Sequence, residues 1–185
     1  MSRTLVSPVV RPLAGADRLR VEALTLACGV FRPAELKVAL EVFDAALGIG
    51  RSADPDYETA GVEQEGQLAG WACWGPVPCT EGTFDLYWIA VDPAAQGQGL
   101  GGALLSEMER RIAGRARLVM VETAGRIEYD PTRAFYERKG FRVAARIADY
   151  YEPGDDLVMY VKSESGQQGI RATGKDDHAP DALIP

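Results

Sequence analysis

The stretch VDPAAQGQGLGGALLSEMERR, from Val91 to Arg111, decides the fold of this chain. Glycine fills four of the six positions from 97 to 102, immediately before a run with apolar residues at helical spacing. This pattern is typical of a strand, a turn of bare backbone amides and a helix start. Such amides bind phosphate groups, because the first N–H groups of a helix have no partner within it. The flanking sequence must then show which phosphate-bearing molecule the loop holds.

Two nucleotide sites compete for this loop. Segment 97–102 fits the G-x-G-x-x-G pattern of dinucleotide-binding folds, and Glu122 stands where their ribose-binding acid is expected. Against this, Asp92–Gln96 separate the glycines from the preceding strand, much of the chain precedes the loop, and too little follows it to complete a doubly wound sheet. A Walker loop is excluded, because the Gly-Lys-Ser/Thr ending is missing after Gly101.

Length and composition make several classes of function improbable for this chain. The chain has 185 residues, 46% hydrophobic and 25% charged, which suits one globular domain with its own core. Its net charge of −7 disfavours binding to a nucleic-acid backbone, and no run of about 18 apolar residues predicts a membrane span. Three cysteines without metal-type spacing and a lone histidine, His178 in a polar tail, predict no metal site and a reducing, cytoplasmic location.

Periodicity and turn residues predict an α/β domain at 1–163, followed by a disordered polar tail at 164–185. Strands are expected at 4–11, as a pair within 57–77 joined at Glu65-Gly66, and at 83–91, 116–123, 141–151 and 155–162. Helices are expected at 18–31, 33–48, 99–114 and 130–141. This order predicts a mixed, mostly antiparallel sheet of six to seven strands flanked by helices.

Two motifs then point to a family. QGQGLG, at 96–101, resembles the Q/R-x-x-G-x-G/A signature of the GNAT acetyltransferase superfamily, and the preceding LYWIAVDP resembles that family's fourth strand and turn. RAFYERKGF, at 133–141, resembles its second motif, with Tyr136 at the tyrosine position. Tyr129 departs from the pattern, since relatives often carry asparagine there. The resemblance spans 4–162 in element order and implies an acyl-CoA N-acyltransferase fold with splayed central strands.

The resemblance implies acetyl-CoA as co-substrate. Its pyrophosphate is expected on the amides of 97–102, where glycines let the backbone approach without a Cβ, and its pantetheine arm is expected along the strand at 89–91. The predicted contacts are Ile89, Ala90, Val91, Gln96, Gly97, Gln98, Gly99, Leu100, Gly101, Gly102, Thr132, Arg133 and Tyr136.

Acetyl transfer to an amine needs a base for the amine, a donor that polarises the thioester oxygen and an acid for the departing thiolate. By resemblance, the Val91 N–H is the donor and Tyr136 is the acid. Asp85, Glu122 and Tyr87 remain open as the base, as does proton loss directly to water. The chain is therefore expected to acetylate a primary amine of a small molecule or protein, as a monomer or homodimer; the alternative is a catalytically silent acyl-CoA-binding sensor.

Three further features bear on the acceptor. The helices within 17–48 are the expected lid over its site. Aromatic strand residues could line the acceptor pocket or, more commonly, form core; they are Trp71, Trp74 and Trp88. The last hairpin carries acidic residues, which we interpret as a solvated turn rather than an acidic mouth; they are Glu152, Asp155 and Asp156.

Overall fold

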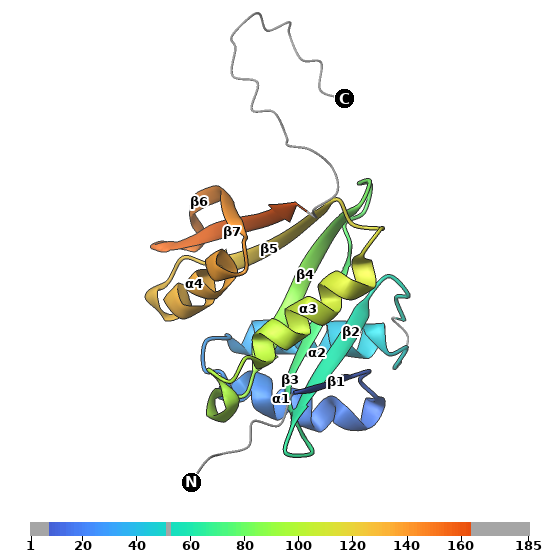
Figure 1. Ribbon diagram of the computed structural model, residues 1–185. Helices are drawn as coiled ribbons and strands as arrows, with labels where there is room; N and C mark the ends of the chain where they lie inside the picture. The colour runs from blue at the N-terminus through green and yellow to red at the C-terminus, as the bar shows by residue number, and fades with distance from the viewer. Residues whose placement is uncertain (1–7, 51–52, 164–185) are drawn as a thin grey trace, which may run out of the picture.

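A computed structural model describes residues 8–50 and 53–163, which form a seven-stranded sheet in the order β1-β2-β3-β4-β5-β7-β6 (Figure 1). The strands are β1 (Val9–Arg11), β2 (Glu58–Gln64), β3 (Gln67–Pro76), β4 (Thr83–Val91), β5 (Leu118–Ala124), β6 (Arg142–Glu152) and β7 (Asp155–Ser163). The helices are α1 (Arg18–Ala27), α2 (Pro33–Ala46), α3 (Leu100–Ile112) and α4 (Asp130–Arg138), with 3-10 turns η1 (Gly15–Asp17), η2 (Pro93–Ala95) and η3 (Ile127–Tyr129).

The described strands pair antiparallel with their neighbours, except that β4 and β5 are parallel. The expected mixed, mostly antiparallel sheet is therefore confirmed. A doubly wound dinucleotide fold requires a mostly parallel sheet, so the dinucleotide reading of the glycine loop is wrong. The proposed tail at 164–185 lies outside the described residues.

Helices cover both faces of the sheet. On one face, α3 and Tyr136 of α4 pack against the central strands in the larger core cluster. On the other face, α1 and α2 pack against β3 and β4. Trp71 and Trp74 are fully buried in opposite clusters, so the core interpretation of these two residues is confirmed. Trp88 is only partly buried and has a different role, described below.

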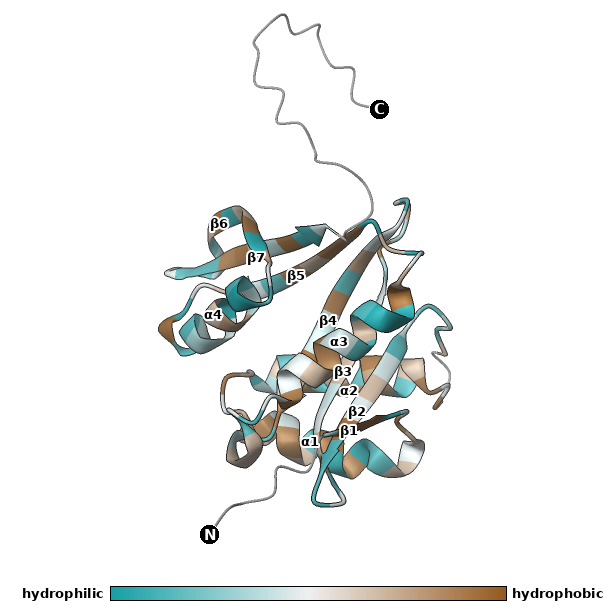
Figure 2. Ribbon diagram, in the orientation of Figure 1, coloured by the Kyte–Doolittle hydropathy of each residue, from teal (hydrophilic) through white to brown (hydrophobic). Residues whose placement is uncertain are grey.

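The helix after the glycine loop is amphipathic, as its spacing predicts. Its inward residues are at most 1% exposed; they are Leu104, Leu105, Met108 and Ile112. Burying each such side chain stabilises the fold by roughly 1.5–3 kcal/mol. Hydrophobic and hydrophilic residues alternate along α3 in Figure 2. This packing holds the N-terminus of α3, and with it the glycine loop, at a constant position beside the end of β4.

The two central strands separate after a short shared segment. Residues 83–85 of β4 pair with 118–120 of β5, and no later residue of β4 has a partner on β5. Beyond that point the strands diverge, as Figure 1 shows. The expected splayed central strands are thus confirmed. A separate finding is that, within the described residues, no helix is both long and apolar enough to cross a membrane.

Candidate active site

A cavity of about 850 Å³ occupies the opening between β4 and β5. Its walls come from residues within 28–38 around the start of α2, the free half of β4, the glycine loop, the end of β5, η3 with α4, and Tyr151 of β6. The cavity is therefore built from six stretches of sequence that meet only in the folded chain. Most of the predicted cofactor residues line it, and the two that do not are Gln98 and Arg133.

The glycine loop presents bare backbone to the cavity. Gly99 caps α3 in a left-handed conformation, with φ of 85°, and Gly97 has φ of 76°. A Cβ at either position would meet nothing within 4 Å. These glycines are therefore required by backbone conformation, while the space beside them stays open for a ligand. The side chain of Gln98 turns away and hydrogen-bonds Gln64 at the β2–β3 turn.

The free edge of β4 carries backbone N–H groups that no neighbouring strand uses. Val91 faces Gly70 of β3, but the neighbouring Asp92 N–H is the one that donates to Ala69 O, at 2.8 Å. In an antiparallel ladder this makes Gly70–Val91 a non-hydrogen-bonded pair, so the Val91 N–H points away from β3. It points to the side from which β5 has separated. Because backbone N–H groups point alternately to the two sides of a strand, the Ile89 N–H points in the same direction as that of Val91.

Two cations line the cavity, Arg138 and Lys139, and Lys139 lies beside the glycine loop. A Cβ on Gly102 would lie only 2.8 Å from the Lys139 Nζ, so the absence of a side chain there admits the lysine. An ammonium beside a helix N-terminus is unfavourable unless an anion lies between them. The sequence analysis missed these residues; their signal was a basic pair at the end of the second motif.

Tyr136 lies deep in the cavity wall. Its side chain is 2% exposed and its ring contacts Phe135, Phe141 and Tyr160. Within the described residues its hydroxyl has no hydrogen-bond partner. Burial, and next the carboxylate of Asp85, raise the pKa of Tyr136 well above its usual value. The phenol is therefore protonated at neutral pH.

The three candidate bases share one sheet face. Asp85 lies at the last shared rung of β4 and β5, and Tyr87 and Glu122 follow it on the two diverging strands. Glu122 and Tyr87 line the cavity, whereas Asp85 lies behind them. Burial, and then the Glu122 carboxylate, raise the pKa of Asp85 to about 7. Burial, and then Asp85, raise the pKa of Tyr87 to about 12, which keeps that phenol protonated.

Some residues of the second motif line the cavity, and another holds the neighbouring backbone in place. Thr132 and Tyr129 line the cavity. Arg133 instead donates to the carbonyl oxygens of Ala124 and Arg126, at 2.6 and 3.0 Å. This arginine therefore holds the β5–α4 loop in place, and it does not line the cavity.

Only part of the region expected to form a lid lies on the cavity. Of the region 17–48, only 28–38 reaches the cavity, where Phe31 packs on Trp88 with ring centroids 5.3 Å apart. Burial, the largest cause, raises the pKa of the Cys28 thiol, which also lines this wall. Trp88 is thus a cavity residue, as one of the two interpretations of the tryptophans allowed.

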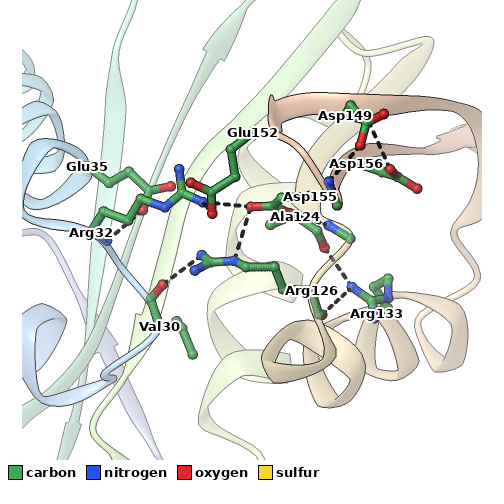
Figure 3. Close-up of polar contacts among 12 residues, drawn as sticks. Val30, Arg32, Glu35, Ala124, Arg126, Arg133, Asp149, Glu152, Asp155 and Asp156 are labelled. Atoms are coloured by element: carbon green, nitrogen blue, oxygen red, sulfur yellow. Dashed lines mark hydrogen bonds and ion pairs between the residues drawn. The ribbon is translucent and has the colours of Figure 1, made fainter.

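A polar clasp ties this lid to the last hairpin (Figure 3). Arg32 donates to Glu152 at 2.7 Å and to Asp155 at 2.8 Å. Arg126 lies 3.2 Å from the same Asp155 carboxylate and donates to Val30 O. Asp155 is 2% exposed, so the expectation of a solvated turn is wrong for this residue. Its carboxylate is buried because it joins three segments.

The fold is that of an acyl-CoA N-acyltransferase, and comparison with known proteins identifies the family. The profile of the acetyltransferase (GNAT) domain matches residues 55–143. A crystal structure described as a GNAT-family acetyltransferase from Desulfovibrio desulfuricans is 40% identical, with a TM-score of 0.78 over 85% of this chain and 99% of that one. The chain therefore belongs to the GNAT acetyltransferase family.

Other relatives differ in length and acceptor. Blasticidin-S acetyltransferase of Streptomyces morookaense is 36% identical over 108 residues, covering 57% of this chain and 74% of the relative. An aminoglycoside 6′-N-acetyltransferase solved with coenzyme A shares the fold at 11% identity, with a TM-score of 0.67 over 87% and 99% of the two chains. Against the first curated relatives, the chain spans 52%, 33% and 45% of their lengths.

Proposed function

We propose that this protein transfers the acetyl group of acetyl-CoA to a primary amine. One observation carries the proposal: a single cavity opens onto both the glycine loop and the unpaired edge of β4. The loop offers amides and a nearby ammonium to a pyrophosphate, while the edge offers hydrogen-bonding groups to an amide-containing arm. A pyrophosphate and an amide-containing arm are two adjoining parts of coenzyme A, and one extended molecule would bring both to this cavity.

The residues that would hold acetyl-CoA follow from this arrangement. Backbone amides of 97–102 and the Lys139 ammonium bind the phosphates, and Ile89 and Val91 pair with the pantetheine arm as an added strand. When bound, acetyl-CoA supplies an acetyl group activated as a thioester. The Val91 N–H then lies where it can donate to the thioester oxygen as negative charge develops on it.

The remaining groups handle protons. The acceptor amine enters from the side of the lid and loses one proton to a base, either Glu122 directly or Asp85 through an intervening group or water. The amine nitrogen forms its bond to the acetyl carbon as the carbon–sulfur bond breaks. Tyr136 donates its hydroxyl proton to the departing sulfur, and the second proton of the amine nitrogen, released as the amide forms, leaves through water and replaces the proton on Tyr136.

A catalytically silent acyl-CoA sensor is the second candidate. Tyr136 favours the enzyme, because its side chain lines the cavity and no hydrogen bond among the described residues gives its hydroxyl a structural role. The test is thiol release from acetyl-CoA in the presence of primary amines, alongside calorimetric titration with acetyl-CoA and with NAD. Binding of acetyl-CoA with turnover supports the enzyme, binding without turnover on any amine supports the sensor, and binding of NAD alone contradicts both.

A further inference from the structure

The polar clasp spans the opening between the two diverging strands. Arg32 belongs to the lid, residues 28–38, and the lid helices pack against β3 and β4. Glu152 and Asp155 belong to the β6–β7 hairpin, and β7 pairs with β5. The bonds from Arg32 to these two carboxylates therefore join the β4 side of the opening to its β5 side (Figure 3). Arg126, just after β5, crosses the opening in the same way, because it donates to the Val30 carbonyl oxygen at 3.2 Å.

The charged side chains of the clasp lie outside the cavity wall. None of them lines the cavity, but Phe31, which precedes Arg32, and Tyr151, which precedes Glu152, both do. The glycine loop and α3 lie on the opposite face of the sheet from α1 and α2. The clasp is therefore on the face opposite the proposed phosphate site, and it crosses the side from which the acceptor amine is proposed to enter.

The closed clasp is the stable arrangement of these segments. The Asp155 carboxylate is 2% exposed, and it contacts Arg32, Arg126 and the Gly125 N–H, at 2.8, 3.2 and 3.2 Å. Separating a buried carboxylate from a guanidinium is strongly unfavourable. The first turn of α2 also fixes the backbone of Arg32, whose N–H donates to Glu35 at 2.6 Å. Opening the lid would therefore break several charged contacts together.

We propose that the clasp restricts the acceptor to small free amines and excludes the N-termini and lysine side chains of folded proteins. This inference rests on the proposed function. An amine of a folded protein is attached to main chain that would have to lie where the clasp crosses the opening. A small amine carries no such chain. Val38 and Tyr151 line the cavity and are 48% and 38% exposed, so solvent and small molecules reach this wall on both sides of the clasp.

Labelling of Cys28 tests access to the cavity without knowledge of the acceptor. Its thiol lines the cavity, 3.5 Å from the Val91 carbonyl oxygen. The protein carries Cys79→Ser, because Cys79 is exposed whereas Cys73 is buried. It is loaded with acetyl-CoA, whose own sulfur is blocked by the acetyl group, so that the cofactor part of the cavity is filled. N-ethylmaleimide and a maleimide attached to polyethylene glycol share one reactive group and differ in size.

We expect N-ethylmaleimide to label Cys28 and the polymer reagent to label it at about one tenth of that rate or less, since a minor open state is typically populated at about 10% or below. Mass spectrometry of the protein over time gives both rates. Equal rates for the two reagents would overturn the proposal, because the clasp would then admit large groups. Failure of the small reagent to label Cys28 would overturn it as well, because small amines would then lack a path.

Removing the bridge tests the clasp itself. Arg32→Ala leaves Asp155 paired with Arg126, so the variant is expected to fold. It should let the polymer reagent label Cys28 at nearly the rate of the small one. The matched control is Arg18→Ala, which removes an arginine of similar exposure that pairs between α1 and α2 and does not line the cavity. A size preference that persists in Arg32→Ala would show that the clasp is not the barrier.

Turnover on acceptors of different size tests the substrate class. Nα-acetyl-lysine amide and folded ubiquitin present the same ε-amine, and small amines of other kinds complete the panel. We expect any thiol release from acetyl-CoA to occur with small amines and not with ubiquitin; release with ubiquitin as fast as with the small amines would overturn the proposal. If acetyl-CoA binds in calorimetry but no acceptor reacts, the proposed function has failed, and the labelling rates still decide whether the clasp limits access.

Discussion

Asp85 on β4 pairs with Met120 on β5, and this is the last rung that the two central strands share. From that rung the strands diverge, which leaves the edge of β4 up to Val91 without a neighbouring strand. Glu122 lies two residues beyond Met120, on the same face as Asp85. The place where β4 and β5 part therefore determines two things. It determines which part of the β4 edge is free for the proposed cofactor, and it determines where two candidate bases lie.

The pH dependence of activity tests Asp85. Its raised pKa, about 7, means that it becomes a competent base only as pH rises through that value. We expect kcat/KM to rise with pH and to show an inflection near 7, which Asp85→Asn should remove. An inflection that persists in Asp85→Asn would exclude this residue as its source.

The same shift predicts a change in stability. Because the pKa of Asp85 is higher in the folded chain than the ordinary value near 4, the folded state binds the proton more tightly. Its contribution to stability is therefore full below pH 4 and is lost as pH rises toward 7. Asp85→Asn should gain stability relative to the unmodified protein at pH 8 more than at pH 4. Thermal denaturation at both values measures this difference.

Tyr136→Phe tests the acid. Removing only the hydroxyl should lower kcat by about 100-fold or more, the usual worth of a general acid, and should leave acetyl-CoA affinity unchanged. Tyr160→Phe is the matched control, since that neighbouring hydroxyl donates to Glu137 at 3.2 Å and does not line the cavity. Equal turnover in both variants would remove Tyr136 from the mechanism.

Gly99→Ala tests the loop. The alanine would adopt an unfavourable left-handed conformation, at a cost of about 1 kcal/mol, in the part of the backbone proposed to grip the pyrophosphate. Gly114→Ala imposes the same strain after α3, where φ is 77° and a Cβ also meets open space. Both variants should lose similar stability, but only Gly99→Ala should lose acetyl-CoA affinity in calorimetry. Equal affinities would contradict the loop assignment.

Lys139→Gln tests the cation beside the helix N-terminus. Its loss should weaken acetyl-CoA binding by about fivefold to tenfold and reduce the salt dependence of that binding, because a charge-assisted contact to phosphate is worth about 1–2 kcal/mol. Lys37→Gln replaces an exposed lysine on α2 that pairs with Glu41, and it should leave binding unchanged. Unaltered affinity in Lys139→Gln would show that the phosphates lie elsewhere.

The clasp predicts an effect on the free energy of unfolding and not on cofactor binding. Asp155→Asn removes a buried charge that two arginines share and should cost about 3–5 kcal/mol of unfolding free energy. Asp156→Asn removes a surface pair with Arg146, 2.5 Å apart, and should cost less than about 1 kcal/mol. Urea denaturation of both variants gives the comparison, and similar small losses would mean that the clasp contributes little.

Most of the element order was predictable because it depends on local signals. Apolar residues at helical spacing marked α3, Glu65-Gly66 marked the β2–β3 turn with φ of 52° and 76°, and the glycines at 97 and 99 marked a backbone that only glycine adopts readily. The family resemblance added the splayed strands. Lys139 was not identified, because the basic pair that ends the second motif gives no indication of what it will face in the folded chain.

The amino-acid sequence by itself determined the glycine loop, the amphipathic helix behind it and the kind of ligand such a loop accepts, since these depend on residues close together in the chain. Only the tertiary structure decided where β4 and β5 part, that Lys139 reaches Gly102, and that Arg32 meets Asp155 across 123 positions. The physical reason is that packing of α3, α4 and the lid on a twisted sheet sets these distances, and no short segment contains that information.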